Sequence, residues 1–166
     1  MKTNLAYNWY AAYTKSRNEK KVLALLQKEN IEVYLPLQKK LKQWSDRKKW
    51  VEVPLFNSYI FVKISEKEYY QVLQTPGIIK YISFEGKAVS IPENQILALQ
   101  KIVEGNLNFE ISSEIFKKGD QIRIDSGSFA GIYGELIEVR ENRKFLIRIE
   151  PIGYSLLINM NLIKKV

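Results

Sequence analysis

The stretch from Leu37 to Val53 alternates basic and aromatic side chains in a pattern that suits contact with nucleic acid. Six Lys and Arg residues stand against Asp46 and Glu52, so the stretch carries half of the chain's net charge of +8. Cationic side chains neutralise phosphates, and aromatic rings between them can stack on bases. The alternative is a solvated ribbon whose lysines protect its edges from pairing. The basic residues are Lys39, Lys40, Lys42, Arg47, Lys48 and Lys49, and the aromatic ones are Trp44 and Trp50.

A second basic group lies on the first expected helix and on the loop before it. It consists of Lys15, Arg17, Lys21 and Lys28. Such a face can bind phosphates, although charged helix faces are also common where a helix only meets solvent. The overall positive charge favours a polyanionic neighbour, either nucleic acid or an acidic protein surface.

A loop rich in glycine lies between two expected strands near the C-terminus. Gly127, Gly131 and Gly134 permit positive φ angles and sharp bends, as the corner of a small barrel requires. No helix and no Gly-Lys-Ser/Thr follow, so the loop does not resemble a phosphate-binding loop. Phe129 on this loop predicts a contact with a partner protein, and the loop from 151 to 154 offers similar apolar material. The expected partner contacts are Phe129, Ile132, Ile152 and Tyr154.

Aromatic residues recur on the strands expected in the first half of the chain. Alternation on a strand places Tyr59 and Phe61 on one face, and Ser58 and Ile60 on the other. Aromatic side chains on a central strand are usually part of the core, and that is the interpretation from the residues alone. The group consists of Trp9, Tyr13, Phe56, Tyr59 and Phe61.

The residue types argue against catalysis. The chain has no Cys and no His, which removes disulfides, most zinc, haem and iron–sulfur ligation, and the usual general base at neutral pH. Asp120 and Asp125 bracket a single strand, and Glu135, Glu138 and Glu141 follow no metal or nucleophile pattern. We therefore expect no enzyme, no cofactor and no metal.

The first two thirds of the chain mix strands and helices. Ser-x-x-Glu patterns at Ser16–Glu19 and Ser65–Glu68 are typical of helix starts, and Pro92 suits the first turn of a third helix. The order of the strands and helices predicts an antiparallel sheet with helices packed on one face, which is an α+β domain. The expected strands are 8–14, 31–35, 58–64 and 78–83, the hairpin is 37–53, and the helices end near Asn30, Gln74 and Val103.

The last third reads as short strands alone. Five strands, at 121–125, 132–140, 144–150, 154–159 and 162–165, predict a small five-stranded β-barrel, because closure removes open sheet edges. The stretch 105–115 loses periodicity and is expected to be a linker. We therefore predict an N-terminal domain at 1–104, a linker at 105–115 and a barrel domain at 116–166.

The location of the protein is predicted from two features of the sequence. Residues 1–13 are too polar for the apolar core of a signal peptide, and no apolar run approaches the roughly 20 residues that span a bilayer. We therefore expect a cytoplasmic protein with no membrane partner.

Several of these segments together resemble the NusG-like transcription factors. The glycine-rich region resembles their KOW motif, and the first domain resembles the NusG N-terminal domain, so the resemblance covers essentially the whole chain. The segments that carry it are Trp9–Thr14, Tyr34–Pro36, Pro54–Val62, Thr75–Gly77, Lys118–Ile124 and Ser126–Gly134, in the order found in the family. One departure is Asn57, where the family typically has proline.

The resemblance implies a transcription elongation and antitermination factor, with a SH3-like KOW barrel. In the family, aromatics of the N-terminal domain grip the RNA polymerase clamp, which implies this role for Tyr13, Phe56, Tyr59 and Phe61. The family's hairpin lies near polymerase and upstream DNA, and in RfaH the first-helix region reads the displaced, non-template strand. The barrel would recruit a second protein, such as a ribosomal protein or Rho, and the factor would act as a monomer.

Two further expectations concern the branch of the family and the competing class. The compact chain, its basic balance and Asn57 favour a specialised antiterminator of the RfaH or UpxY kind, which would act on capsular polysaccharide operons. The alternative is a KOW-type RNA-binding protein of the ribosome or of RNA processing. That class predicts that Arg140, Arg143, Lys144 and Arg148 bind RNA without polymerase.

Overall fold

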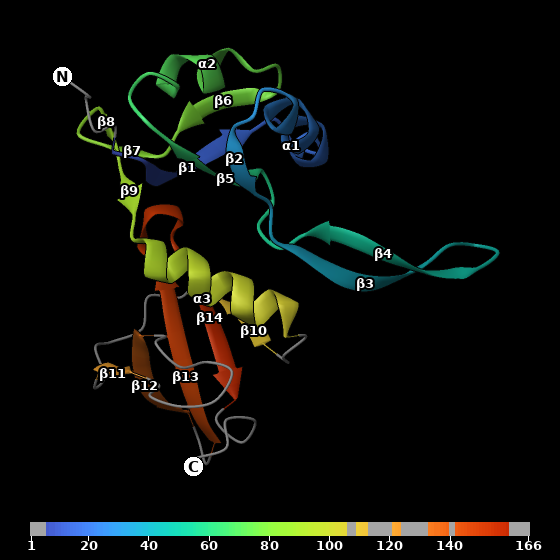
Figure 1. Cartoon of the computed structure of the whole chain (residues 1–166). Coiled ribbons are helices and arrows are strands. Elements are labelled where there is room, and N and C mark those ends of the chain that lie inside the picture. The colour runs from blue at the N-terminus through green and yellow to red at the C-terminus, as the bar shows by residue number, and fades with distance from the viewer. Residues whose placement is uncertain (1–5, 106–108, 113–120, 124–132, 140–141, 160–166) are drawn as a thin grey trace. The chain divides into compact units, whose positions relative to one another are not determined.

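The computed structural model describes residues 6–105, 109–112, 121–123, 133–139 and 142–159 (Figure 1). The chain divides into two compact units, residues 1–90 and 91–166. Each unit is described by itself.

The first unit is built on an antiparallel sheet with β1 (Asn8–Thr14) at its centre. β1 pairs with β5 (Tyr59–Ile64) on one side and with β6 (Ile78–Tyr81) on the other, and β2 (Glu32–Tyr34) pairs with β5 at the edge. The short strand β9 (Ser90–Ile91) also pairs with β1. β1, β2, β5 and β6 confirm the strands expected from the apolar and aromatic runs of the sequence, whereas β9 was not predicted.

Two helices cover one face of this sheet. Val22 and Leu26 of α1 (Glu19–Lys28) and Val72 of α2 (Tyr69–Gln74) are buried in one cluster with Ile60 and Val62 of β5. The cluster takes the even-numbered residues of β5, as the period of two in a strand requires. The predicted α+β arrangement, with these two helices on one face, is confirmed.

Tyr81 closes the end of this cluster. Its hydroxyl donates a hydrogen bond to the carbonyl oxygen of Tyr69 at 3.0 Å, and its ring lies 4.4 Å from that of Tyr69. The pKa of Tyr81 is raised above its usual range. Burial of the hydroxyl is the largest cause, and the neighbouring Tyr69 and Tyr10 add to it. The residue therefore stays neutral across the physiological pH range.

The two helix starts differ from each other. The expected capping pair of Ser16 and Glu19 is wrong, because α1 begins after Asn18 without a side-chain cap. At the second site the Ser65 amide and hydroxyl both donate to Glu68 Oε2, each at 2.8 Å. Glu68 thus reaches back to Ser65, as one half of the capping pattern predicts, but α2 begins after Glu68 and has no side-chain cap either.

The basic stretch forms the expected hairpin. β3 (Leu37–Gln43) pairs along its whole length with β4 (Lys48–Pro54), and the Trp44 amide donates to the Arg47 carbonyl at 2.8 Å across the turn. Figure 1 shows the hairpin extending away from the sheet of the first unit. A second, shorter hairpin of β7 (Ser83–Phe84) and β8 (Lys87–Ala88) was not predicted.

The second unit combines a helix with a five-stranded antiparallel sheet. α3 (Glu93–Glu104) begins directly after Pro92, as expected, and contacts β12 (Tyr133–Val139) and β13 (Asn142–Ile149). The sheet order is β10-β14-β13-β12-β11, and a single 3-10 turn, Glu150–Ile152, leads into β14. The remaining strands are β10 (Phe109–Ser112), β11 (Gln121–Arg123) and β14 (Tyr154–Asn159).

Two elements of the second unit lie outside the stretch predicted for the barrel domain. β10 falls inside the stretch expected to be a linker, and α3 groups with the second unit. The strand expected at 162–165 lies outside the described residues. Barrel closure and the domain limits 1–104, 105–115 and 116–166 stay predictions.

None of the helices in the described ranges is both long and apolar enough to span a membrane.

Candidate functional site

One face of the first sheet is lined with aromatic side chains. Strand pairing places Tyr13 opposite Tyr59 and Phe61 opposite Tyr34. Ala11 lies opposite Phe61, and Trp9, two residues earlier on β1, therefore points to the same face. It is the face opposite the one that α1 and α2 cover, since those helices pack on the even-numbered residues of β5. We call this surface the aromatic face, and it consists of Trp9, Tyr13, Tyr34, Phe56, Tyr59 and Phe61.

The rings of the aromatic face contact one another in two groups. Tyr13 and Tyr59 meet edge to face with centroids 5.4 Å apart. Phe61 lies 6.3 Å from Phe56 in an edge-to-face contact and 6.4 Å from Tyr34 in a stacked one. These are favourable arrangements for aromatic pairs. The structure therefore brings together the residues predicted to bind polymerase and adds Tyr34.

Exposure differs across this face. Phe56 and Phe61 are buried, with 1% and 0% of their surface exposed, whereas Tyr13 and Tyr59 are half-buried. Lys63 of β5 lies beside the aromatic residues, with Nζ 6.0 Å from the Trp9 ring and 3.9 Å from Glu32 Oε2. A binding experiment on this face must therefore use the tyrosines, because a change at Phe61 also changes folding.

The loop that carries Phe56 is held by a buried carboxylate. Glu19, only 5% exposed, accepts a hydrogen bond from the Ser58 amide at 2.8 Å. Ser58 has a positive φ of 64°, and its carbonyl accepts the Thr14 amide at 2.8 Å. The exposed Asn57 lies inside this turn. Glu19 was expected only to cap a helix, and its contact 39 residues away could not be read from the local pattern.

Removing that carboxylate is expected to loosen the loop. Glu19→Ala should lower the free energy of unfolding by about 1.5–3 kcal/mol, because it leaves the Ser58 amide without its charged acceptor. Glu19→Gln keeps an oxygen acceptor for the Ser58 amide and should lower the free energy of unfolding by less. Urea unfolding of both variants measures the difference, and equal stability of Glu19→Ala and the wild type would contradict this role.

The basic residues predicted to contact nucleic acid are exposed and fall into two groups. All six of the hairpin lie on β3, β4 or the turn between them, and the exposed Lys15, Arg17, Lys21 and Lys28 lie on α1 and the loop before it. Lys20, which was not predicted to matter, connects the groups because its Nζ donates to the Glu52 carbonyl at 2.8 Å. This bond ties β4 to the start of α1.

The expected partner contacts of the second unit are only partly described. Phe129 and Ile132 lie outside the described residues. Ile152, the last residue of the 3-10 turn, is buried, and Tyr154, the first residue of β14, is half-buried. Within the described ranges, no three acidic side chains gather in a way that could hold a metal ion.

Comparison with known proteins places this arrangement in a family. The family model described as transcription termination factor nusG matches residues 7–100. The transcription termination/antitermination proteins NusG of Staphylococcus aureus strains Mu50 and N315 are each 26% identical over 164 residues, covering 89% of this chain and 88% of theirs. The solved structure described as domain interaction in Thermotoga maritima NusG covers 93% of both chains with a TM-score of 0.50 and 22% identity, so the fold is shared.

The matched segment includes every residue of the aromatic face and the whole hairpin. It also spans more than half of the chain. The chain therefore belongs to the NusG family of transcription termination and antitermination factors.

Proposed function

We propose that the protein binds the clamp of RNA polymerase through its aromatic face and supports elongation and antitermination. The observation that carries this proposal is the row of aromatic rings on the sheet face opposite α1 and α2. Half-buried tyrosines beside fully buried phenylalanines form a preorganised apolar surface, and tyrosine is enriched in the energetic centres of interfaces. Tyr13 and Tyr59 are the proposed polymerase contacts, and Phe56 and Phe61, also predicted as contacts, are buried and would form the support of this surface.

The other parts of the chain have proposed roles around this contact. The exposed bases of the hairpin and of α1 would neutralise upstream or non-template DNA. The second unit would form the KOW barrel and recruit a protein, such as a ribosomal protein or Rho, through Phe129, Ile132, Ile152 and Tyr154. The basic balance and Asn57 support a specialised factor of the RfaH or UpxY kind, acting on capsular polysaccharide operons.

A binding experiment with core RNA polymerase tests the main proposal. The intact protein is expected to be captured by immobilised core enzyme, and Tyr13→Ala with Tyr59→Ala should weaken capture by about tenfold or more. Tyr70→Ala is the matched control, because Tyr70 is 71% exposed and lies on α2, away from the aromatic face.

Two results would overturn the proposal. One is failure of the intact, folded protein to bind polymerase. The other is an equal loss in the Tyr70 variant, which would show that the aromatic face is not the contact. Circular dichroism of each variant separates lost contacts from lost folding.

A further inference from the structure

The pairing register divides the hairpin into two chemically different faces. Residues directly opposite each other on paired strands share a face, and the next pair points to the other side. Lys40 lies opposite Val51 and Lys42 opposite Lys49, and the alternation carries Trp44 and Arg47 to this same side across the turn. We call this side the basic face, and its functional residues are Lys40, Lys42, Trp44, Arg47 and Lys49.

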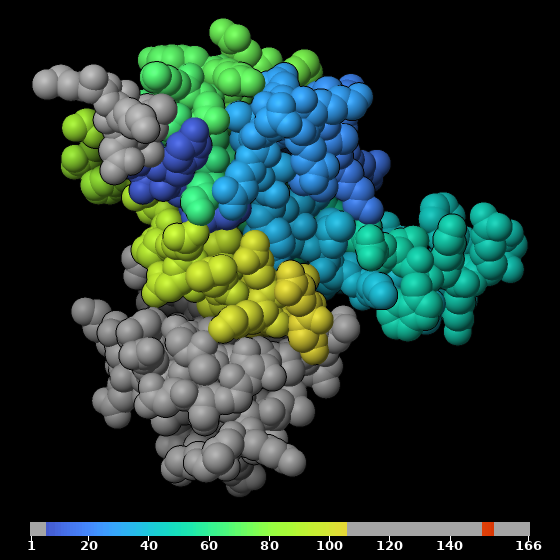
Figure 2. All heavy atoms as spheres, viewed as in Figure 1, coloured from blue at the N-terminus to red at the C-terminus, as the bar shows by residue number. Residues whose placement is uncertain are grey.

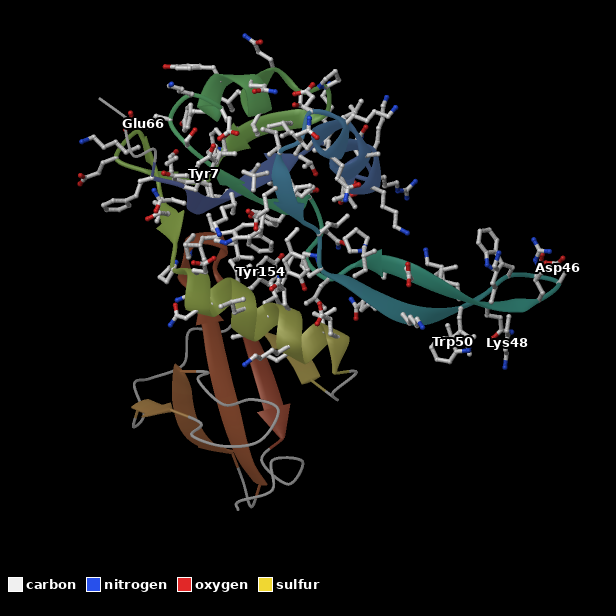
Figure 3. The ribbon with its side chains drawn as sticks, in the orientation of Figure 1. Tyr7, Asp46, Lys48, Trp50, Glu66 and Tyr154 are labelled. Carbon is white, nitrogen blue, oxygen red and sulfur yellow. The ribbon has the colours of Figure 1, made fainter. Side chains whose placement is uncertain are left out.

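The opposite face carries little net charge. It contains Lys39 directly across from Glu52, Leu41 across from Trp50, and Gln43 across from Lys48. Figure 3 shows Lys48 and Trp50 projecting to the same side of the ribbon, with Asp46 at its tip. Two lysines and one glutamate give this face a charge of +1, whereas the basic face has four cations and no acidic residue. The hairpin's excess charge is therefore concentrated on one side.

Like charges on the basic face repel each other and destabilise the hairpin. Lys42 and Lys49 are both exposed and directly opposite each other, and like charges in this position destabilise a ribbon. The hairpin projects from the first unit as a narrow arm, shown in teal in Figure 2, so its tip is open to a large partner. A bound polyanion would replace this repulsion with attraction.

Trp44 indicates which kind of polyanion fits. Its side chain is 56% exposed and shares the basic face with Lys42 and Arg47. In a duplex the bases are stacked inside, so an indole beside the phosphate contacts meets no ring. A single strand offers phosphates and unstacked bases to the same surface, and base–aromatic stacking contributes substantially to such binding.

We infer that the basic face of the hairpin binds single-stranded nucleic acid, with Lys40, Lys42, Arg47 and Lys49 on phosphates and Trp44 stacked on a base. The inference rests on the proposed contact of the hairpin with nucleic acid and narrows it to one face and one strand. DNA and RNA single strands present the same phosphate and base chemistry, so separate probes distinguish them.

Fluorescence anisotropy with the full chain, without polymerase, tests this inference. The probes are labelled 15-nucleotide oligo-dT, 15-nucleotide oligo-U and a 15-base-pair DNA duplex. At least one single strand is expected to bind more tightly than the duplex, with a log–log salt slope of about −3 from four phosphate contacts. A preference for oligo-dT or for oligo-U identifies the natural strand as DNA or RNA.

Matched variants on the two faces test the assignment itself. Lys42→Gln with Lys49→Gln should reduce the steepness of the salt slope by about 1.4, since two phosphate contacts are lost. Lys39→Gln with Lys48→Gln removes the same charge from the opposite face and should change the slope much less. Trp44→Ala should weaken single-strand binding about fivefold or more, and Trp50→Ala, which removes the same side chain from the other side, should not.

Three results would overturn the inference. They are absence of single-strand binding, duplex binding as tight as that of both single strands, and equal effects of the paired variants on the two faces. All hairpin variants should still be captured by polymerase through the aromatic face. Loss of polymerase capture with intact strand binding therefore refutes the proposed function alone, and the reverse result refutes only the hairpin inference.

Discussion

Phe61→Ala is expected to lower the free energy of unfolding by about 3–5 kcal/mol. Phe61 has no exposed surface, and its ring contacts those of Tyr34 and Phe56. Truncation removes the buried apolar area and leaves a cavity on the central part of the sheet, where β5 is paired on both sides. Urea unfolding followed by circular dichroism measures the change.

Phe84→Ala is the matched control for this prediction. Phe84 is 71% exposed on the short β7–β8 hairpin, so its loss should change stability by less than about 0.5 kcal/mol. If Phe61→Ala lowered the free energy of unfolding as little as Phe84→Ala is expected to, Phe61 would not be a core residue. Since loss of folding also abolishes binding, Phe61→Ala cannot by itself identify the polymerase contact.

Gly77→Ala is expected to destabilise the first unit by about 2–4 kcal/mol. Gly77 has a φ of +104°, which L-residues rarely adopt, and an added Cβ would lie 2.8 Å from Val22 Cγ2. Val22 is fully buried between α1 and the sheet, so it cannot move aside cheaply. Thermal or urea unfolding gives the size of the loss.

Gly86→Ala separates the two causes of this loss. Gly86 also has a positive φ, +78°, but nothing lies within 4 Å of an added Cβ. Its substitution should therefore cost only the backbone strain, about 1–2 kcal/mol. If Gly77→Ala cost no more than Gly86→Ala, the contact with Val22 would be irrelevant.

Features that depend on local periodicity could be predicted from the sequence. The alternation of Tyr59, Ile60 and Phe61 correctly separated the two faces of β5, and the hairpin formed around the expected turn. Pro92 marked the start of α3. In each case the residues that decide the structure lie within a few positions of one another, where steric preference and burial act directly.

Features that depend on distant contacts could not be predicted. The carboxylate of Glu19 serves Ser58 and the ammonium of Lys20 serves the Glu52 carbonyl, over 39 and 32 residues respectively. No local pattern specifies such pairs, and for Glu19 a plausible local role, helix capping, was available and wrong. The division of the hairpin bases by face required the pairing register, because a shift of one residue would exchange the two sides.

The hairpin also sets the distance over which the proposed contacts can act together. Seven paired residues extend about 20 Å, and the bond from Lys20 to the Glu52 carbonyl connects this arm to α1. The arm would link two binding sites, the aromatic face and the hairpin tip. Binding of polymerase at the aromatic face would then raise the effective concentration of nucleic acid at the hairpin tip. Weak affinity at each contact then suffices for a long-lived complex, and a loosened base would lower avidity without touching either surface.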